Sequence, residues 1–248
     1  MSLQRFSYEE RPDLAERMEG ADQGAFPEFL LHDDIWNEAW PRLISDFAPF
    51  QYVLYDADRD AVIGAANAVP VRWDGTPGDL PAGTHDALQR ALAEHVAGTE
   101  PNTVCGVQAI ATPEARGTGL SQAFVEAAPL RAQELGMEHS ITPLRLLLKE
   151  RYPITPIAEY IQWKGTDGSP FDPWLRVWER AGAERLEVCH DSLVIEGSVS
   201  EWEDWTGIDF PVSGSYVITG GQVLLEIDRD RDRGRYSEPH LWIKLRVD

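Results

Sequence analysis

A loop with two closely spaced glycines carries the residue types best suited to chemistry in this chain. It runs from Thr112 to Ser121 and reads Thr-Pro-Glu-Ala-Arg-Gly-Thr-Gly-Leu-Ser. Gly117 and Gly119 let successive main-chain N–H groups turn toward one point without side-chain obstruction. That point lies at the start of the next helix, where unpaired N–H groups and the helix dipole favour an anion. The pattern therefore predicts a site for a diphosphate.

The glycines by themselves are equally compatible with an ordinary turn between a strand and a helix. The loop is not a Walker loop, because no Lys-Ser or Lys-Thr pair follows the second glycine. It also lacks the three-glycine spacing of a dinucleotide fingerprint, and its surroundings do not read as a repeating βαβ unit. An anion site and a plain turn thus both remain open at this point.

Hydrophobic periodicity predicts the elements that must position this loop. A β-branched strand over Thr103–Ala111 precedes it, and a helix over Leu120–Leu135 follows, which Pro129 is expected to kink or split. The remaining expected elements are a helical segment Phe26–Phe47 with a break near residues 32–34, an antiparallel hairpin of Gln51–Asp56 and Ala61–Val71, a helix Leu88–Val96, a strand Ile141–Leu148, a helix Trp174–Ala181, one or two strands in Arg185–Ile195, a helix Val199–Trp205, and strands Ser215–Thr219, Gln222–Ile227 and His240–Val247.

Composition excludes several classes of protein. The 248 residues are 43% hydrophobic and 26% charged, which is typical of a globular domain. With 22 basic and 42 acidic residues, the formal net charge is −20, so sequence-independent nucleic-acid binding and binding to anionic membranes are not expected. No apolar run is long enough to span a bilayer. Two cysteines are too few for a disulfide scaffold or a cysteine zinc site, and a cytoplasmic location is expected.

The order of these elements around a Pro-x-x-Arg-Gly-x-Gly loop resembles the GNAT acyltransferase superfamily, over roughly residues 25–190. In that family an Arg/Gln-x-x-Gly-x-Gly/Ala motif binds the pyrophosphate of coenzyme A. Arg116 and Gly119 match its first and fourth positions, and Ser121 takes the sixth, where Gly or Ala is usual. The resemblance implies an α+β, GNAT-like acyl-CoA N-acyltransferase fold, with a mixed, largely antiparallel central sheet flanked by helices. It places that domain in residues 1–197 and a C-terminal β-rich extension, packed on the same domain, in residues 198–248.

The resemblance also implies a co-substrate and a reaction. Acetyl-CoA or another acyl-CoA would bind, and a small-molecule amine would attack the thioester directly, without an acyl-enzyme. The main chain of Ala109, Ile110 and Ala111 would pair with the pantetheine arm. The implied residues of the pyrophosphate loop are Arg116, Gly117, Thr118, Gly119, Leu120 and Ser121.

Groups that could move a proton are less clearly marked. Many family members carry a Tyr four residues before the glycine of a late helix, where this chain has Trp178, and indole is not a useful acid. Tyr152 and Tyr160 are candidate proton donors, with amphipathic packing as the alternative. Glu150 is a candidate base or a holder of a cationic acceptor, with a solvated carboxylate as the alternative. The basic residues Arg145, Lys149 and Arg151 suit the phosphates of CoA, an acidic acceptor or a solvated loop.

Two other classes of function stay open, namely a non-catalytic GNAT-fold module that binds acyl-CoA or a protein, and acyl transfer to or from a carrier-protein thiol. No metal is expected, because the adjacent His32, Asp33 and Asp34 resemble a helix cap more than a set of converging ligands. Residues 198–248 can extend the domain, cover the acceptor cleft or form a homodimer contact.

Overall fold

A single mixed sheet organises the protein, and the computed structural model describes residues 2–18 and 24–247 of it. Within these ranges nine strands follow the order β1-β2-β3-β4-β5-β9-β8-β7, and β6 pairs with β9. Among the described strands only β4 and β5 run parallel, so the expected mixed, largely antiparallel sheet is confirmed. The strands are β1 (Leu3–Ser7), β2 (Tyr52–Asp56), β3 (Ala61–Val71), β4 (Thr103–Ala111), β5 (His139–Leu144), β6 (Glu184–Gly197), β7 (Gly214–Tyr216), β8 (Leu225–Asp228) and β9 (Arg233–Leu245).

Helices cover both faces of this sheet. The helices are α1 (Pro12–Glu16), α2 (Asp34–Asp46), α3 (Thr84–Ala97), α4 (Leu120–Glu134), α5 (Ile157–Tyr160), α6 (Pro173–Arg180) and α7 (Val199–Thr206). Alternation along β9 shows which helices lie on which side, because successive side chains of a strand point to opposite faces. Trp242 packs in one core cluster with α2 and α3, whereas Leu241 and Ile243 pack in another with α4 and α6. None of the described helices is long and apolar enough to cross a membrane.

Most expected elements are present, with some different limits. The hairpin β2–β3 is confirmed, and α4 continues through Pro129 without the expected split. The strand expected over 141–148 ends at Leu144, because β5 has lost β4 as a partner by then and pairs only with β9. The strand expected from His240 begins at Arg233, because β9 pairs with β6 as far as Gly234. The sequence patterns did not predict β1 or α1.

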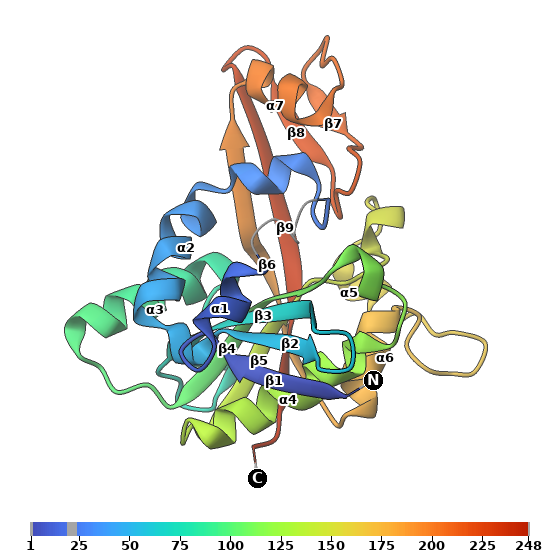
Figure 1. Ribbon diagram of the computed structural model, residues 1–248. Coiled ribbons are helices and arrows are strands. Elements are labelled where there is room, and N and C mark those ends of the chain that lie inside the picture. Colours follow the sequence, from blue (N-terminus) through green and yellow to red (C-terminus); the bar gives the residue numbers. More distant parts are fainter. Residues whose placement is uncertain (1, 19–23, 248) are drawn as a thin grey trace.

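The long pair β6–β9 extends beyond the main body of the sheet (Figure 1). Residues 198–232 are inserted between these two strands and form α7, β7 and β8. They build their own apolar cluster, in which Trp202 and Tyr236 pack against Phe29 from the 3-10 turn before α2. Part of the expected extension 198–248 therefore stands apart as an insertion, while β9 returns to the central sheet beside β5.

Close packing between β3 and α4 depends on Gly64. A Cβ atom there would lie 2.6 Å from Cζ of Phe124 and 2.7 Å from the main-chain oxygen of Ile110. We predict that Gly64→Ala lowers the free energy of unfolding by about 1–3 kcal/mol, the usual cost of overpacking. Gly78→Ala is the control, because nothing lies within 4 Å of a Cβ at Gly78. Urea denaturation of both variants checks this, and equal stabilities would contradict it.

Candidate functional site

The loop between β4 and α4 leaves main-chain N–H groups unpaired where the helix begins. The amides of Arg116 and Thr118 are used inside the loop, where they donate to main-chain carbonyls at 3.4 Å. Gly117 and Gly119 have φ angles of 77° and 86°, in the left-handed region that favours glycine. Four amides donate to no acceptor among the residues described, namely those of Gly117, Gly119, Leu120 and Ser121. Such a cluster at a helix N-terminus is suited to an anion.

Strands β4 and β5 separate beside this loop. They pair only from Thr103 to Cys105, after which β4 continues to Ala111 with β3 as its partner on the opposite edge. A register shift between β3 and β4 marks the same place, since Asn67 pairs with Gln108 but Ala68 pairs with Gly106. The edge of β4 from Gly106 onward is therefore open on the side of β5, and Ala109, Ile110 and Ala111 belong to this open edge.

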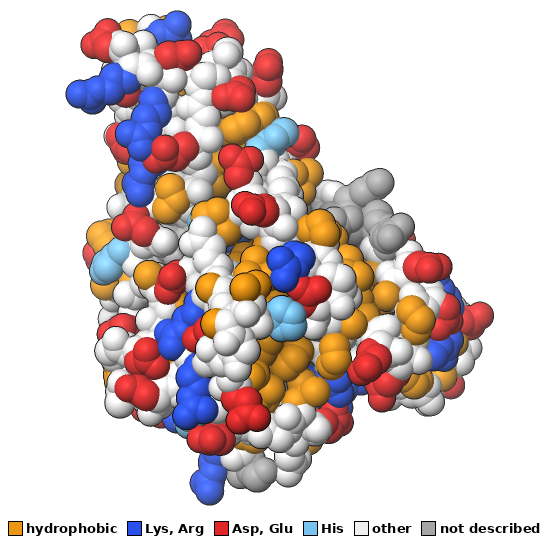
Figure 2. Space-filling view, turned by 90° about the vertical axis from the view of Figure 1, so that its left-hand side faces the viewer, with side chains coloured by type: hydrophobic (Ala, Val, Ile, Leu, Met, Phe, Trp, Pro, Cys, Tyr) orange, Lys and Arg blue, Asp and Glu red, His pale blue; other side chains and the backbone are white. Residues whose placement is uncertain are grey.

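A cavity of about 1290 Å³ occupies the space between the separated strands. Arg116, Gly119 and Ser121 line it at the loop, and Ala109–Ala111 line it along β4. The wall continues to residues of α2 and to the start of α3. Figure 2 looks onto the side of the molecule where α2 and α3 lie, and hydrophobic side chains gather across the middle of this face.

The α2 part of the wall is aromatic and acidic. Trp36 and Trp40 both line the cavity, and their rings stack with centroids 6.1 Å apart. Asp33 caps α2 by accepting the N–H of Trp36 at 3.0 Å, as expected, and its other oxygen lies 2.6 Å from Nε2 of His85. Because the N–H of Val194 donates to Nδ1 of His85, Nε2 carries the proton and donates to Asp33. A cation or a planar polar group suits this wall.

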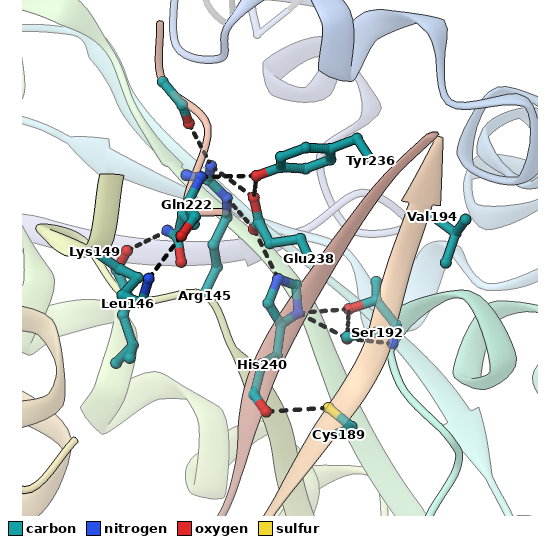
Figure 3. A network of polar contacts seen from close by, with 12 residues as sticks. Arg145, Leu146, Lys149, Cys189, Ser192, Val194, Gln222, Tyr236, Glu238 and His240 are labelled. Carbon is teal, nitrogen blue, oxygen red and sulfur yellow. Dashed lines mark hydrogen bonds and ion pairs between the residues drawn. The ribbon is translucent and has the colours of Figure 1, made fainter. Parts of the chain in front are cut away.

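A buried polar network forms a further part of the wall (Figure 3). Glu238 is fully buried, and its Oε1 accepts from Nε of Arg145 at 2.6 Å and from Nε2 of His240 at 3.0 Å. Nδ1 of His240 lies 2.8 Å from the hydroxyl of Ser192 and 3.1 Å from that of Thr84. Arg145, His240 and Thr84 line the cavity. The β9 register explains the cluster, because Glu238 and His240 are two residues apart and share one face.

This network keeps Glu238 ionised. Burial alone would raise the pKa of its carboxyl group, but the Arg145 guanidinium and the hydrogen bond from His240 outweigh burial and lower the pKa to about 2. The hydroxyl of Tyr236 also donates to Oε2 of Glu238 and accepts the N–H of Gln222 at 2.8 Å. The carboxylate is therefore an acceptor on every side.

One donor on the cavity wall has no partner. The indole of Trp178 is 5% exposed and lines the cavity, and its Nε1 has no hydrogen-bond partner among the described residues. A buried N–H without a partner is costly unless a ligand or water supplies an acceptor. Trp178 therefore places a buried, unpaired N–H in the side chain that lines this part of the cavity.

The three side chains predicted for proton transfer lie elsewhere. Glu150, Tyr152 and Tyr160 do not line this cavity, and Glu150 is exposed to solvent. The hydroxyl of Tyr160 donates to Asp172 at 2.9 Å, and burial together with that carboxylate raises its pKa. Tyr152 packs edge-on against Trp163. Both tyrosines make packing contacts here, and their role as proton donors stays a prediction.

The basic residues near β5 are not a free phosphate-binding stretch. Arg145 is paired with Glu238. Lys149 is 1% exposed and donates to the main-chain oxygens of Tyr152 at 2.8 Å and Gln222 at 2.6 Å. Burial lowers the pKa of Lys149 to about 8. Of the three, only Arg151 is exposed.

The residues near the break before α2 do not converge on a metal. His32 stacks on Trp205 with ring centroids 4.5 Å apart, while Asp33 is the helix cap described above. No group of three or more His, Cys, Asp or Glu side chains in the described part of the chain is placed to hold a metal ion.

Thr84, Ser192, Glu238 and His240 were not among the residues predicted from sequence. A signal was present for two of them, because Tyr236, Glu238, His240 and Trp242 alternate with period two. That pattern is typical of a strand face, but polar residues on it read equally well as a solvent-facing edge. Thr84 and Ser192 reach His240 from α3 and β6, and their positions depend on tertiary packing alone.

Sequence and structure comparisons identify known proteins that resemble this chain. No family model matches the chain. The chain is 27% identical to the arginine N-acetyltransferase avaD of Aspergillus versicolor, across 94% of this chain and 90% of that protein. It is similar to the crystal structure of the loading GNATL domain of CurA from Lyngbya majuscula, with a TM-score of 0.57, 17% identity, and coverage of 99% of this chain and 97% of that one. An agmatine N-acetyltransferase variant gives a TM-score of 0.46 at 12% identity, covering 99% of this chain and 98% of that one.

The low pKa of Glu238 makes folding depend on pH. A carboxyl pKa lowered from 4.5 to about 2 on folding contributes stability that is present above pH 4.5 and is lost as pH falls toward 2. That pKa difference corresponds to about 3 kcal/mol. We predict that Glu238→Gln flattens the fall in unfolding free energy over this window, whereas the exposed Glu100→Gln does not. Denaturant titrations at several pH values measure the slope, and an unchanged slope in Glu238→Gln would refute the assignment.

Proposed function

We propose that the chain is a member of the GNAT acyltransferase superfamily and that it moves an acetyl group from acetyl-CoA to a small-molecule amine. The observation that carries this proposal is the set of four unpaired amides at the start of α4, which lie in residues 117–121. This part of the chain lines a cavity that continues along the open edge of β4. The anion site suits the diphosphate of a ligand, and the open strand edge suits an extended arm that bears amide groups.

We propose the following placement of the donor. The diphosphate of acetyl-CoA lies at the loop from Arg116 to Ser121, where unpaired N–H groups and the helix dipole offset its charge. The pantetheine arm follows the edge of β4 through Ala109–Ala111, whose main-chain groups would pair with its amides. Six residues of open edge, Gly106–Ala111, span about 20 Å at strand spacing, which is long enough for an extended arm.

The acceptor in this proposal is a cationic amine. Glu16 and Asp33 bring carboxylates to the part of the wall formed by α1 and α2, and the stacked Trp36 and Trp40 present aromatic faces there. Aromatic faces attract guanidinium and ammonium groups. Because the relative from Aspergillus versicolor is named an arginine N-acetyltransferase, arginine is the first acceptor to try.

Direct attack by the amine fits this chain better than an acyl-enzyme, because neither cysteine is suited to act as the nucleophile. Cys105 and Cys189 do not line the cavity, and burial raises the pKa of both thiols. A thiol held in its neutral form inside the core is a poor nucleophile. The thioester is therefore attacked by the amine itself.

Release of free CoA thiol tests the reaction. We predict that the intact protein releases thiol from acetyl-CoA when arginine is added, and that a mass increase of one acetyl group appears on the amino acid. Lysine and agmatine serve as further cationic acceptors, and glutamate as an acidic comparison. Tight acetyl-CoA binding without thiol release from any amine would favour a non-catalytic binding module instead. Loss of the acetyl group only to a carrier-protein thiol would favour the third alternative.

The donor loop is tested by glycines at the two ends of α4. Gly119 and Gly136 both have positive φ angles, 86° and 68°, and nothing lies within 4 Å of a Cβ at either. Gly119→Leu and Gly136→Leu should therefore carry similar backbone strain. We predict that only Gly119→Leu abolishes acetyl-CoA binding in calorimetric titration, because its side chain fills the anion site. Retained binding in Gly119→Leu would place the diphosphate elsewhere.

A further inference from the structure

We infer that His240, acting through the hydroxyl of Thr84, takes the proton from the acceptor amine. This inference rests on the proposed function, since it assigns the base for that reaction. The hydroxyl of Thr84 lies 3.1 Å from Nδ1 of His240, and both residues line the cavity. Neither residue is in the donor loop, so the base and the anion site occupy different parts of one cavity.

The hydrogen bond to Glu238 places a hydrogen on Nε2 of the His240 imidazole. The carboxylate of Glu238 has no proton to give, so the 3.0 Å contact with Nε2 of His240 requires that Nε2 carry the hydrogen. In the neutral form of the ring the lone pair of Nδ1 then faces two hydroxyl groups, those of Ser192 at 2.8 Å and Thr84 at 3.1 Å. A neutral imidazole with a free lone pair on one side and a carboxylate on the other can accept a proton, because the carboxylate stabilises the imidazolium that forms.

Only one of the two hydroxyls can receive a proton from the cavity. Ser192 is fully buried and does not line the cavity, whereas Thr84 does line it. Thr84 is the first residue of α3, and its N–H donates to the hydroxyl oxygen of Ser192 at 2.9 Å. Close approach of α3 to β6 requires Gly83, because a Cβ there would lie 2.2 Å from Cα of Ser192. The backbone therefore holds Thr84 between the cavity and His240.

The proton balance of the step is complete. The acceptor ammonium gives one proton to the hydroxyl oxygen of Thr84, whose own proton passes to Nδ1 of His240, directly or through Ser192. The freed nitrogen lone pair attacks the thioester carbonyl, the C–N bond forms, and the C–S bond breaks with its electron pair on sulfur. The second N–H proton then leaves the new amide nitrogen for the thiolate, and the imidazolium returns its proton to solvent.

Thr84 is the residue to vary, because its replacement by valine keeps the side-chain shape and removes only the hydroxyl. We expect Thr84→Val to lower kcat about 100-fold, the usual contribution of a general base, while the acetyl-CoA dissociation constant stays unchanged. Thr84→Ser should restore kcat to within a few-fold. Thr206→Val, which removes a hydroxyl that donates to Trp202 on the distant α7, is the matched control. If Thr84 had only a structural role, Thr84→Ser would not restore kcat while the acetyl-CoA dissociation constant stayed unchanged.

Nitrogen-15 NMR of histidine-labelled protein provides a readout that needs no turnover. We expect the His240 signals to show hydrogen on Nε2 and a bare Nδ1, with assignment from a His240→Asn variant. Hydrogen on Nδ1 would overturn the inference, as would a Thr84→Val enzyme with undiminished kcat. A wild-type protein that releases no thiol with any amine would overturn the proposed function itself and the base role with it, so the two failures are distinguishable.

Discussion

The end of pairing between β4 and β5 after Cys105 and Ile141 is the constraint on which the cavity depends. Gly106 marks this point, because a Cβ there would lie 2.8 Å from the hydroxyl of Thr142 on β5. Beyond it the main-chain groups on one edge of β4 lack a strand partner, and buried N–H and C=O groups are rarely left unpaired. In the binding mode proposed above, an extended ligand with amide donors and acceptors would satisfy them. Under that proposal, strand separation and ligand binding answer the same backbone requirement.

A second requirement comes from charge burial on β9. Arg145 and Glu238 bring ionic groups together at the edge of the cavity, and removal of one partner of such a pair leaves an uncompensated charge. The same carboxylate orients His240, and through it the hydroxyls of α3 and β6. One buried ion pair therefore links the end of β5, the strand β9 and the cavity wall.

Local patterns predicted the elements, and long-range packing decided what they do. The glycine spacing and the adjoining strand and helix gave the position of the loop before α4, because turn chemistry and helix starts are local properties of a chain. Tyr160 shows the limit of local patterns, because only the fold reveals that its hydroxyl lies 2.9 Å from Asp172.

The wall of the cavity was hidden for a related reason. Thr84, Ser192 and His240 are separated by 108 and 48 residues along the chain, and only the register of β6 on β9 and the close approach of α3 bring them together. The sequence showed that Trp178 stands where many family members have a tyrosine acid. Only the structure showed that its indole N–H is buried without a hydrogen-bond partner among the described residues.

The place of β9 in the sheet has a consequence for biosynthesis. It follows every other described strand in the chain, yet it lies between β5 and β6, and β6 has no other strand partner among the described residues. A nascent chain must therefore leave the ribosome with both neighbouring edges bare until residues 233–245 emerge. During that interval the exposed edges are open to pairing with other chains, so the speed at which translation completes this region bears on how much protein escapes aggregation.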